Sequence, residues 1–359
     1  MELYFNLFKV KYEKLMELFR QDETVNISTK DIVNIFINLE SLFINMTNPK
    51  VKDYLVVNQK SSTVQFIACV INLAAHYRWF FTKNKIKSKI YLYFPTLSTA
   101  EYKNRLFNKD YRRYYDYKFK EDIQNSLVYK TLTSSIPIIN MILEYIEGVY
   151  FIDSHNIENS VIPYIIRESE KDESVNFIVS NSFYDFQYVN YGFKIIVPRR
   201  DESALINQYN AIDYIANFHN CSGTYTFSSK FLPFILSLVG NKNRNIYNIK
   251  GVQFKSAYKL IQTAFDKKML GNESTNIHML INIVKPAWRD IISINYYCTD
   301  IIYQYNQLNS KDIHDILSQV TDKFDNASLR KINDKYFTQL PIMLMEITAI
   351  PSGKRNVNF

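Results

Sequence analysis

The feature that most constrains the fold is an alternation of short β-rich segments with helical segments in the first two thirds of the chain. Runs rich in Ile, Val, Tyr and Phe predict strands at 90–94, 149–153, 175–180 and 193–198, and a further buried strand that turns into a helix is predicted within 30–43. Apolar periodicity predicts helices at 63–81, 136–146, 159–170 and 183–190. Strands separated by helices of this length form βαβ units, so we expect a parallel sheet that helices cover on both faces.

The second half of the chain has a different pattern. Beyond about Ser229 the β signal fades and nearly every segment has helical periodicity. The first 25 residues predict an amphipathic helix that precedes the sheet. We therefore expect an N-terminal helical extension at 1–28, an α/β domain at 29–228 and a helical region at 229–359, and no Pro- or Gly-rich linker separates them.

Composition excludes several classes of protein. With 47% hydrophobic and 22% charged residues, the 359-residue chain is typical of packed globular proteins. No apolar run reaches the roughly 18–20 residues that a membrane span requires. The first twenty residues carry charge throughout, which is not the pattern of a secretory signal, so we expect a cytoplasmic protein without a membrane partner. The net charge of +8 permits binding to nucleic-acid phosphates but does not require it.

The most specific segment is a predicted helical hairpin at 231–261, FLPFILSLVGNKNRNIYNIKGVQFKSAYKLI. A helix ends at Gly240, and the tight loop NIKG leads into a second helix at 254–265. Gly251 permits close approach of a partner, and the free N–H groups at the start of a helix bind phosphate. Positively charged and hydroxyl side chains gather at the same end; they are Lys250, Lys255, Lys259 and Ser256. The segment predicts binding of a phosphate without regard to base identity.

This hairpin resembles the helix–three-turn–helix of the 5′–3′ exonuclease and flap endonuclease family. The positions that fit the family's frame are Leu238, Gly240, Asn245, Ile246, Ile249, Gly251, Val252, Lys255, Ser256, Ala257, Leu260 and Ile261. The alternative is an ordinary helical hairpin with exposed lysines. The resemblance implies a PIN-like domain with a central parallel sheet flanked by helices, followed by an α-helical region that contains the hairpin.

Other segments extend the resemblance over roughly residues 30–340. The run EYKNRLFNKDYRRYYDYKFK at 101–120 matches the family's single-strand-threading arch, which implies DNA contacts from Lys103, Arg105, Arg112 and Arg113. A solvated Tyr-rich helix explains the same run, and both interpretations stay open. SNSFYDFQYV at 180–189 corresponds to a family strand end, with Gln187 in register, and DNASLRKINDKYF at 325–337 resembles the tail of phage members.

The family's acidic metal ligands are missing from the aligned positions. Relatives hold two divalent ions with clustered carboxylates, the ligands that Mg²⁺ prefers. Here the aligned residues are neutral or basic; they are Asn38, Pro95, Ile157, Asn159, Ser160, Ser182, Tyr184, Asn241 and Arg244. Arg244 would place a cation where a metal-site Asp belongs, and we expect it to contact DNA or anchor a protein partner. The resemblance therefore implies a scaffold without metal and without catalytic residues.

Acidic residues next to the missing ligands are candidates to replace them as metal ligands. Glu40, Asp153, Glu158 and Asp185 lie within a few residues of the aligned positions. A slip of one residue turns a helical side chain by about 100° and moves a strand side chain to the opposite face of the sheet. Four compensations at once are improbable, so we expect these acids to be solvated or to form local caps.

Three functional hypotheses follow. The first is a catalytically inactive flap-endonuclease-like protein, phage-encoded, that binds duplex DNA or a single-stranded flap in DNA replication, in transcription or in a phage assembly, in the infected host cell or the virion. The second is an active, divergent 5′–3′ exonuclease that uses Mg²⁺ or Mn²⁺. The third is a structural subunit that contacts only proteins. The degenerate ligand positions favour the first hypothesis, under which no cofactor is required.

Overall fold

The fold is built on a six-stranded, mostly parallel sheet with helices on both faces. The computed structural model describes residues 10–23, 25, 27–28, 31–39, 59–95, 127–143, 148–154, 157, 159–170, 174–198, 203–221, 223, 225–240, 246–271 and 277–320. The strands are β1 (Ile32–Asn38), β2 (Lys87–Pro95), β3 (Val149–Ser154), β4 (Val175–Val179), β5 (Phe193–Val197) and β6 (Ala204–Ile206). Their order across the sheet is β3-β2-β1-β4-β5-β6, and only β6 is antiparallel to its neighbour.

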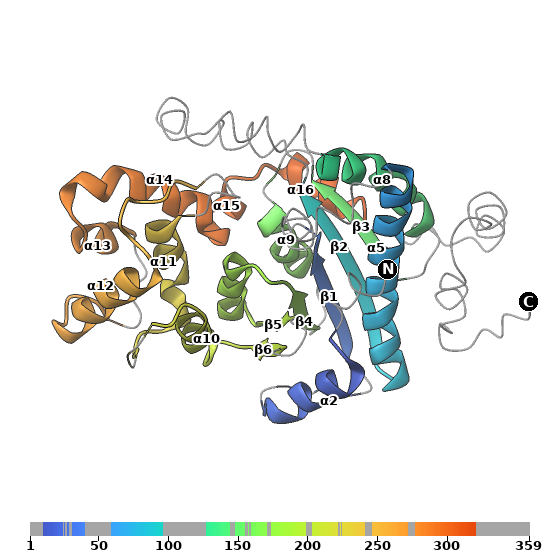
Figure 1. Ribbon diagram of the computed structural model, residues 1–359, viewed down its shortest axis with the longest axis horizontal. Coiled ribbons are helices and arrows are strands. Elements are labelled where there is room, and N and C mark those ends of the chain that lie inside the picture. The colour runs from blue at the N-terminus through green and yellow to red at the C-terminus, as the bar shows by residue number, and fades with distance from the viewer. Residues whose placement is uncertain are drawn as a thin grey trace, which may run out of the picture.

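Three helices cover one face of the sheet: α2 (Tyr12–Gln21), α5 (Gln59–Lys83) and α8 (Leu127–Leu143). Apolar residues of β1 that point to this face, including Val33, Ile35 and Ile37, are buried against them. Figure 1 shows α5 and α8 side by side along the sheet, and α2 near one end of β1. The predicted N-terminal helix therefore packs on the α/β domain, where Phe19 contacts Phe80, Phe81 and Phe177.

The opposite face of the sheet carries the second core and the helical region. Its helices are α9 (Ile162–Ser169), α10 (Ala211–Phe218), α11 (Leu232–Val239), α12 (Phe254–Asp266), α13 (Ile277–Asn282), α14 (Arg289–Thr299), α15 (Ile301–Asn306) and α16 (Ser310–Leu317). Short 3-10 helices lie at Asn159–Val161 (η1), Phe183–Tyr191 (η2), Ser229–Phe231 (η3) and Pro286–Trp288 (η5). Aromatic and aliphatic residues of these helices form one continuous core with the sheet.

The last described helices return to the α/β domain. Figure 1 shows α11 to α14 at one end of the molecule and α16 close to the sheet. The Gln319 side chain donates to the backbone carbonyl of Asp153 (3.2 Å) and accepts from its N–H group (2.9 Å), so the end of β3 is tied to the segment after α16. The buried Gln187 side chain donates to Thr299 O (2.8 Å) and links η2 to α14. The boundary at 228/229 stays a prediction.

The predicted architecture is confirmed. The predicted strands correspond to β1 to β5, the regular elements described beyond residue 229 are all helices, and the helix predicted at 254–265 is α12. The sequence pattern did not indicate the short antiparallel strand β6. The predicted arch at 101–120 and the predicted tail at 325–337 lie outside the described residues. Of the helices in the described part of the chain, none is long and apolar enough to cross a membrane.

Candidate functional site

Strand order places a candidate site at the carboxyl ends of β1 and β4. From β1 the chain proceeds to β2 and β3 on one side, whereas β4 and β5 lie on the other side. Connections that diverge in this way leave a crevice beyond the carboxyl ends of the two central strands, where α/β proteins place their ligands. Asn38 ends β1, and Ser180 directly follows β4. Asn38, one of the positions that the sequence alignment singled out, therefore falls where the topology favours a site.

A buried hydrogen-bond network occupies this edge. Asn38 Nδ2 donates to Asp185 Oδ2 (2.7 Å), and Ser180 Oγ donates to the same oxygen (2.5 Å). The Ser182 N–H group in turn donates to Ser180 Oγ (3.0 Å). Asn38, Ser180 and Asp185 are at most 1% exposed. A carboxylate buried at this depth requires such donors, because desolvation without hydrogen bonds is costly.

Asp185 differs from the expectation for the neighbouring acids. We expected Asp185 to be solvated or to cap locally, but its side chain is fully buried at the candidate site. The physical reason is the 3-10 helix η2, which begins at Phe183, shortly after β4 ends at Val179, and carries Asp185 in its first turn. The Asp185 N–H group donates to Ser182 O (3.0 Å), and the side chain then faces Asn38 on β1. Glu40 and Glu158 lie outside the described residues, and Asp153 is half-buried at the end of β3.

The other aligned positions have structural roles or lie elsewhere. Ser160 is buried in η1, and its hydroxyl donates to Gln304 Oε1 (3.4 Å) of α15. Tyr184 packs its ring against Leu236 and Ile246 of the hairpin region. Pro95 ends β2 and Asn159 begins η1, but the structure does not describe their side chains, and Asn241 is outside the described residues. The structure thus brings together the aligned positions Asn38 and Ser182 with Ser180, which was not singled out, and with Asp185, one of the four neighbouring acids.

The described residues at this edge do not fit a two-metal site. Such a site needs several carboxylates on shared ions. Here one carboxylate, Asp185, already accepts from an amide and a hydroxyl. In the part of the chain that the structure describes, no group of three or more His, Cys, Asp or Glu side chains is arranged to hold an ion.

Burial changes the pKa of two groups near this region. Burial raises the pKa of the Asp300 carboxyl, which accepts from the Tyr303 N–H group (2.6 Å) as the N-cap of α15, and this hydrogen bond opposes the rise. Burial also raises the pKa of the Cys221 thiol, and the ammonium group of Lys255 opposes it. Cys221 lies three residues beyond the end of α10.

The tip of the predicted hairpin is a tight turn exposed to solvent. The Val252 N–H group donates to Ile249 O (2.9 Å), and both side chains are buried. Between them Lys250 and Gly251 are exposed, and Gly251 has φ +82°, as the third residue of a type II turn requires. A Cβ atom added at Gly251 would meet no heavy atom within 4 Å. The turn therefore leaves an open approach to its backbone.

Positive charge concentrates around this turn. Residues 229–271 contain eight Lys and Arg residues and one Asp, a net charge of +7 in a chain of +8. Lys250, Lys255 and Lys259 are all exposed at or near the start of α12. The Ser256 hydroxyl donates to Gln253 O (2.9 Å) and accepts from its N–H group (2.9 Å), so it caps α12. Arg244 and the predicted arch residues Lys103, Arg105, Arg112 and Arg113 lie outside the described residues.

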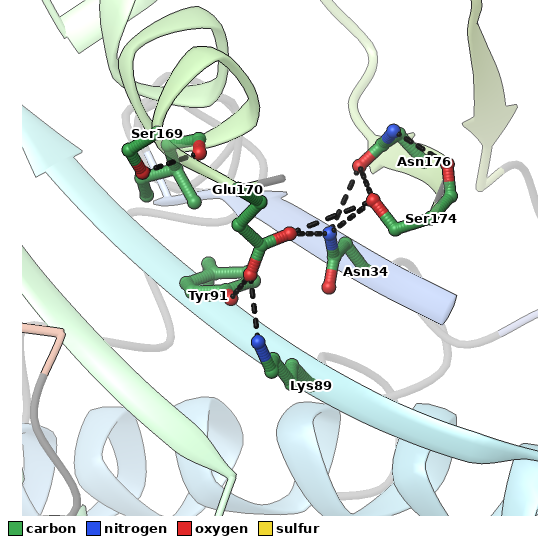
Figure 2. A network of polar contacts seen from close by, with 8 residues as sticks. Asn34, Lys89, Tyr91, Ser169, Glu170, Ser174 and Asn176 are labelled. Carbon is green, nitrogen blue, oxygen red and sulfur yellow. Dashed lines mark hydrogen bonds and ion pairs between the residues drawn. The ribbon is translucent and has the colours of Figure 1, made fainter. Parts of the chain in front are cut away.

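A second polar network lies at the amino end of the same sheet face. Figure 2 shows Glu170, at the end of α9, between Asn34 of β1 and two side chains of β2. Lys89 Nζ (2.7 Å) and Tyr91 OH (2.9 Å) donate to Glu170 Oε1, and Asn34 Nδ2 donates to Oε2. Asn34 also donates to Asn176 Oδ1 of β4 (3.1 Å). This network joins α9 to three strands and has a structural role.

Neither of the two hydrogen-bond networks was predicted from the sequence. One signal was present: Asn34, Phe36 and Asn38 alternate along β1, so all three side chains share a face. Two amides in an otherwise apolar strand indicate buried polar partners at both ends of that face. No signal in the sequence indicated that the partners are Glu170 and Asp185.

Comparison with known proteins gives a distant structural likeness. No protein-family model matches the chain, and no curated protein matches it. Three of the solved structures that resemble it are the 5′-exonuclease of T5 with bound zinc (TM-score 0.41, 11% identity), a bacteriophage T5 flap endonuclease in a pseudo-enzyme–product complex with DNA and metal ions (0.41, 12%) and a T5 protein co-crystallised with metal ions (0.42, 12%). Each comparison covers 88% of this chain and 99% of the other. TM-scores below 0.5 leave large differences in how the elements are placed, so nothing about this chain's site follows from these structures.

Proposed function

We propose that this protein binds the phosphate backbone of duplex DNA through its basic hairpin, as a flap-endonuclease-like protein that does not cleave DNA. The observation that carries the proposal is the exposed Lys250–Gly251 turn, held by buried Ile249 and Val252 at the start of α12. Its open backbone and the net charge of +7 that the sequence carries over residues 229–271 suit a polyanion. A role in phage replication, transcription or virion assembly stays part of this proposal.

The arrangement favours binding without base recognition. Phosphate contacts fix the position of a protein on DNA but carry no sequence information. Lysine ammonium groups act as point charges on phosphates, and the turn presents its backbone where a bulkier residue would stand in the way. Lys250, Lys255 and Lys259 are exposed, so neutralising phosphates does not disturb the hairpin's own packing. We therefore expect affinity that depends strongly on salt and weakly on sequence.

The carboxyl edge of the sheet supports the absence of cleavage. Phosphodiester hydrolysis in such enzymes needs clustered carboxylates that hold metal ions. At this edge the described polar side chains, Asn38, Ser180 and Asp185, bind one another in a buried network. They point into the protein instead of toward a substrate. This arrangement favours a structural role for the former site.

The test is duplex affinity as a function of salt concentration. Wild type and the Lys250→Ala/Lys255→Ala double variant are compared on a blunt duplex of mixed sequence. Each lost phosphate contact lowers the slope of log affinity against log salt by about 0.9, so we expect a loss approaching two contacts. The matched control is Lys285→Ala/Lys311→Ala, which removes two exposed lysines outside the hairpin. Equal slopes for wild type and the hairpin variant would refute the proposal.

A cleavage assay separates the three hypotheses. A 5′-flap substrate is incubated with the protein and Mg²⁺ or Mn²⁺. Binding without cleavage is the expected result. Cleavage that EDTA abolishes would establish the active-nuclease alternative, and neither binding nor cleavage would leave the protein-contact alternative.

A further inference from the structure

Four aromatic rings form a contact cluster between the carboxyl edge of the sheet and the start of α12. This aromatic cluster consists of Phe183, Phe218, His219 and Phe254. Phe183 contacts the other three rings at centroid distances of 5.1, 5.2 and 5.8 Å. His219 stacks on Phe254 with centroids 3.9 Å apart and planes 12° apart. Because Phe183 follows Ser182, the cluster begins directly beside the candidate site.

The cluster is open on the side of Phe218. That ring is 46% exposed, although it makes edge contacts with Phe183 and His219. The residues through which α10 packs into the core are elsewhere on the helix, at Ala211, Ile212, Ile215 and Ala216. Phe218 therefore presents part of its aromatic ring to solvent.

Positive charge lies next to this surface. Phe254 is the first residue of α12, and Lys255 follows it. Lys255 also lies close enough to Cys221, three residues after Phe218, to affect that thiol. Lys255 thus borders the aromatic cluster on the α12 side. Aromatic rings beside lysines suit single-stranded nucleic acid, whose bases stack while its phosphates meet the cations.

We propose that the aromatic cluster is a stacking site for an unpaired base of a DNA strand whose backbone lies on the basic hairpin. The inference rests on the proposed function and adds to it a binding site for an unpaired base. Bases inside a duplex are stacked on their neighbours and cannot reach Phe218. Only unpaired bases can therefore stack on the aromatic cluster. A protein partner that docks on the same ring would not require an unpaired base.

The experiment uses two DNA probes of mixed sequence. One is a blunt duplex, and the other is the same duplex with a single-stranded overhang that contains 2-aminopurine, whose fluorescence falls when it stacks. Phe218→Ala is expected to weaken binding of the overhang probe about tenfold and to reduce the quenching, with blunt-duplex affinity unchanged. Stacking is sequence-tolerant, so a change of the overhang's sequence should not alter this result.

The matched control is Tyr209→Ala. Tyr209 precedes α10 and is 74% exposed, so it is a solvent-exposed aromatic near the opposite end of the same helix. We expect the Tyr209→Ala variant to bind both probes with wild-type affinity. Phe218→Trp should retain quenching, and Phe218→Leu, which preserves apolar contacts without a π face, should behave like Phe218→Ala and serves if the alanine variant does not fold.

Three outcomes would overturn the inference. They are equal weakening of both probes by Phe218→Ala, unchanged binding of the overhang probe, and the same loss with Tyr209→Ala. If wild type binds the overhang with quenching but does not bind the blunt duplex, the proposed duplex function fails and the stacking site stands. If wild type binds the blunt duplex without any preference for the overhang, the proposed function stands and the stacking site is refuted.

Discussion

The carboxyl edge of the sheet and the basic hairpin use their polar groups in opposite ways. At the edge, Asn38, Ser180 and Asp185 are buried and bind one another. On the hairpin, Lys250, Lys255 and Lys259 are exposed around an open turn. The polar groups of the carboxyl edge therefore stabilise the fold, whereas those of the basic hairpin are available to a partner. Substitutions at the edge should therefore change stability, and substitutions on the hairpin surface should change binding.

The largest effect on stability is expected at Gly240, a hairpin residue whose backbone conformation the fold requires. Gly240, at the end of α11, has φ +71°, and a Cβ atom there would lie 2.4 Å from the carbonyl oxygen of Tyr247. Because the contact is with backbone, Gly240→Ala forces the loop to move, and we expect a loss of more than about 3 kcal/mol of unfolding free energy. Gly271→Ala, where no heavy atom would lie within 4 Å of the new Cβ, is the control. Urea unfolding measures both, and a Gly240→Ala loss as small as the control's would show that the loop is not tightly seated.

The second largest effect on stability is expected at the carboxyl edge of the sheet. Asp185→Ala leaves the Asn38 amide and the Ser180 hydroxyl without their buried acceptor, which we expect to cost about 2–4 kcal/mol of unfolding free energy. Asp315→Ala removes an exposed carboxylate on α16 and should change stability by less than about 0.5 kcal/mol. Duplex affinity of the folded Asp185→Ala protein should equal that of wild type. A large loss of affinity in a stable, folded variant would mean that the edge contacts DNA.

Gly251→Val sharpens the contrast on the hairpin. The space around Gly251 is open, so the folding cost comes from positive φ and should be about 1–2 kcal/mol. A branched side chain at the tip would stand between the backbone and a phosphate. We therefore expect duplex affinity at low salt to fall about tenfold or more, a larger loss than any single lysine-to-alanine variant gives. Titration of a labelled duplex measures this, and unchanged affinity would show that the turn does not approach DNA.

The smallest effect tests a residue that lies on the hairpin but binds within it. Ser256 caps α12 through Gln253, so Ser256→Ala should cost about 0.5–1 kcal/mol of unfolding free energy with little change in duplex affinity. Ser256→Thr retains the hydroxyl and should preserve most of the stability. The opposite pattern, normal stability with weakened binding, would make Ser256 a phosphate ligand, as the sequence predicts.

Local patterns in the sequence predicted much of this protein. Runs of β-branched and aromatic residues identified the strands, and the change to helical periodicity near residue 229 identified the helical region, because both signals are local in the sequence. The hairpin could also be predicted from the sequence, because its buried Ile249 and Val252 and its exposed Lys250–Gly251 turn lie within four residues.

Only the tertiary structure decided which distant side chains meet. Asn38 and Asp185 are 147 positions apart, and Asn34 and Glu170 are 136 positions apart. Both pairings depend on strand order, and that of Asp185 depends also on the 3-10 helix η2 that follows β4. The aromatic cluster likewise joins residues of η2, α10 and α12. Local periodicity sets which face a side chain occupies, but strand order and turn geometry determine what stands opposite it.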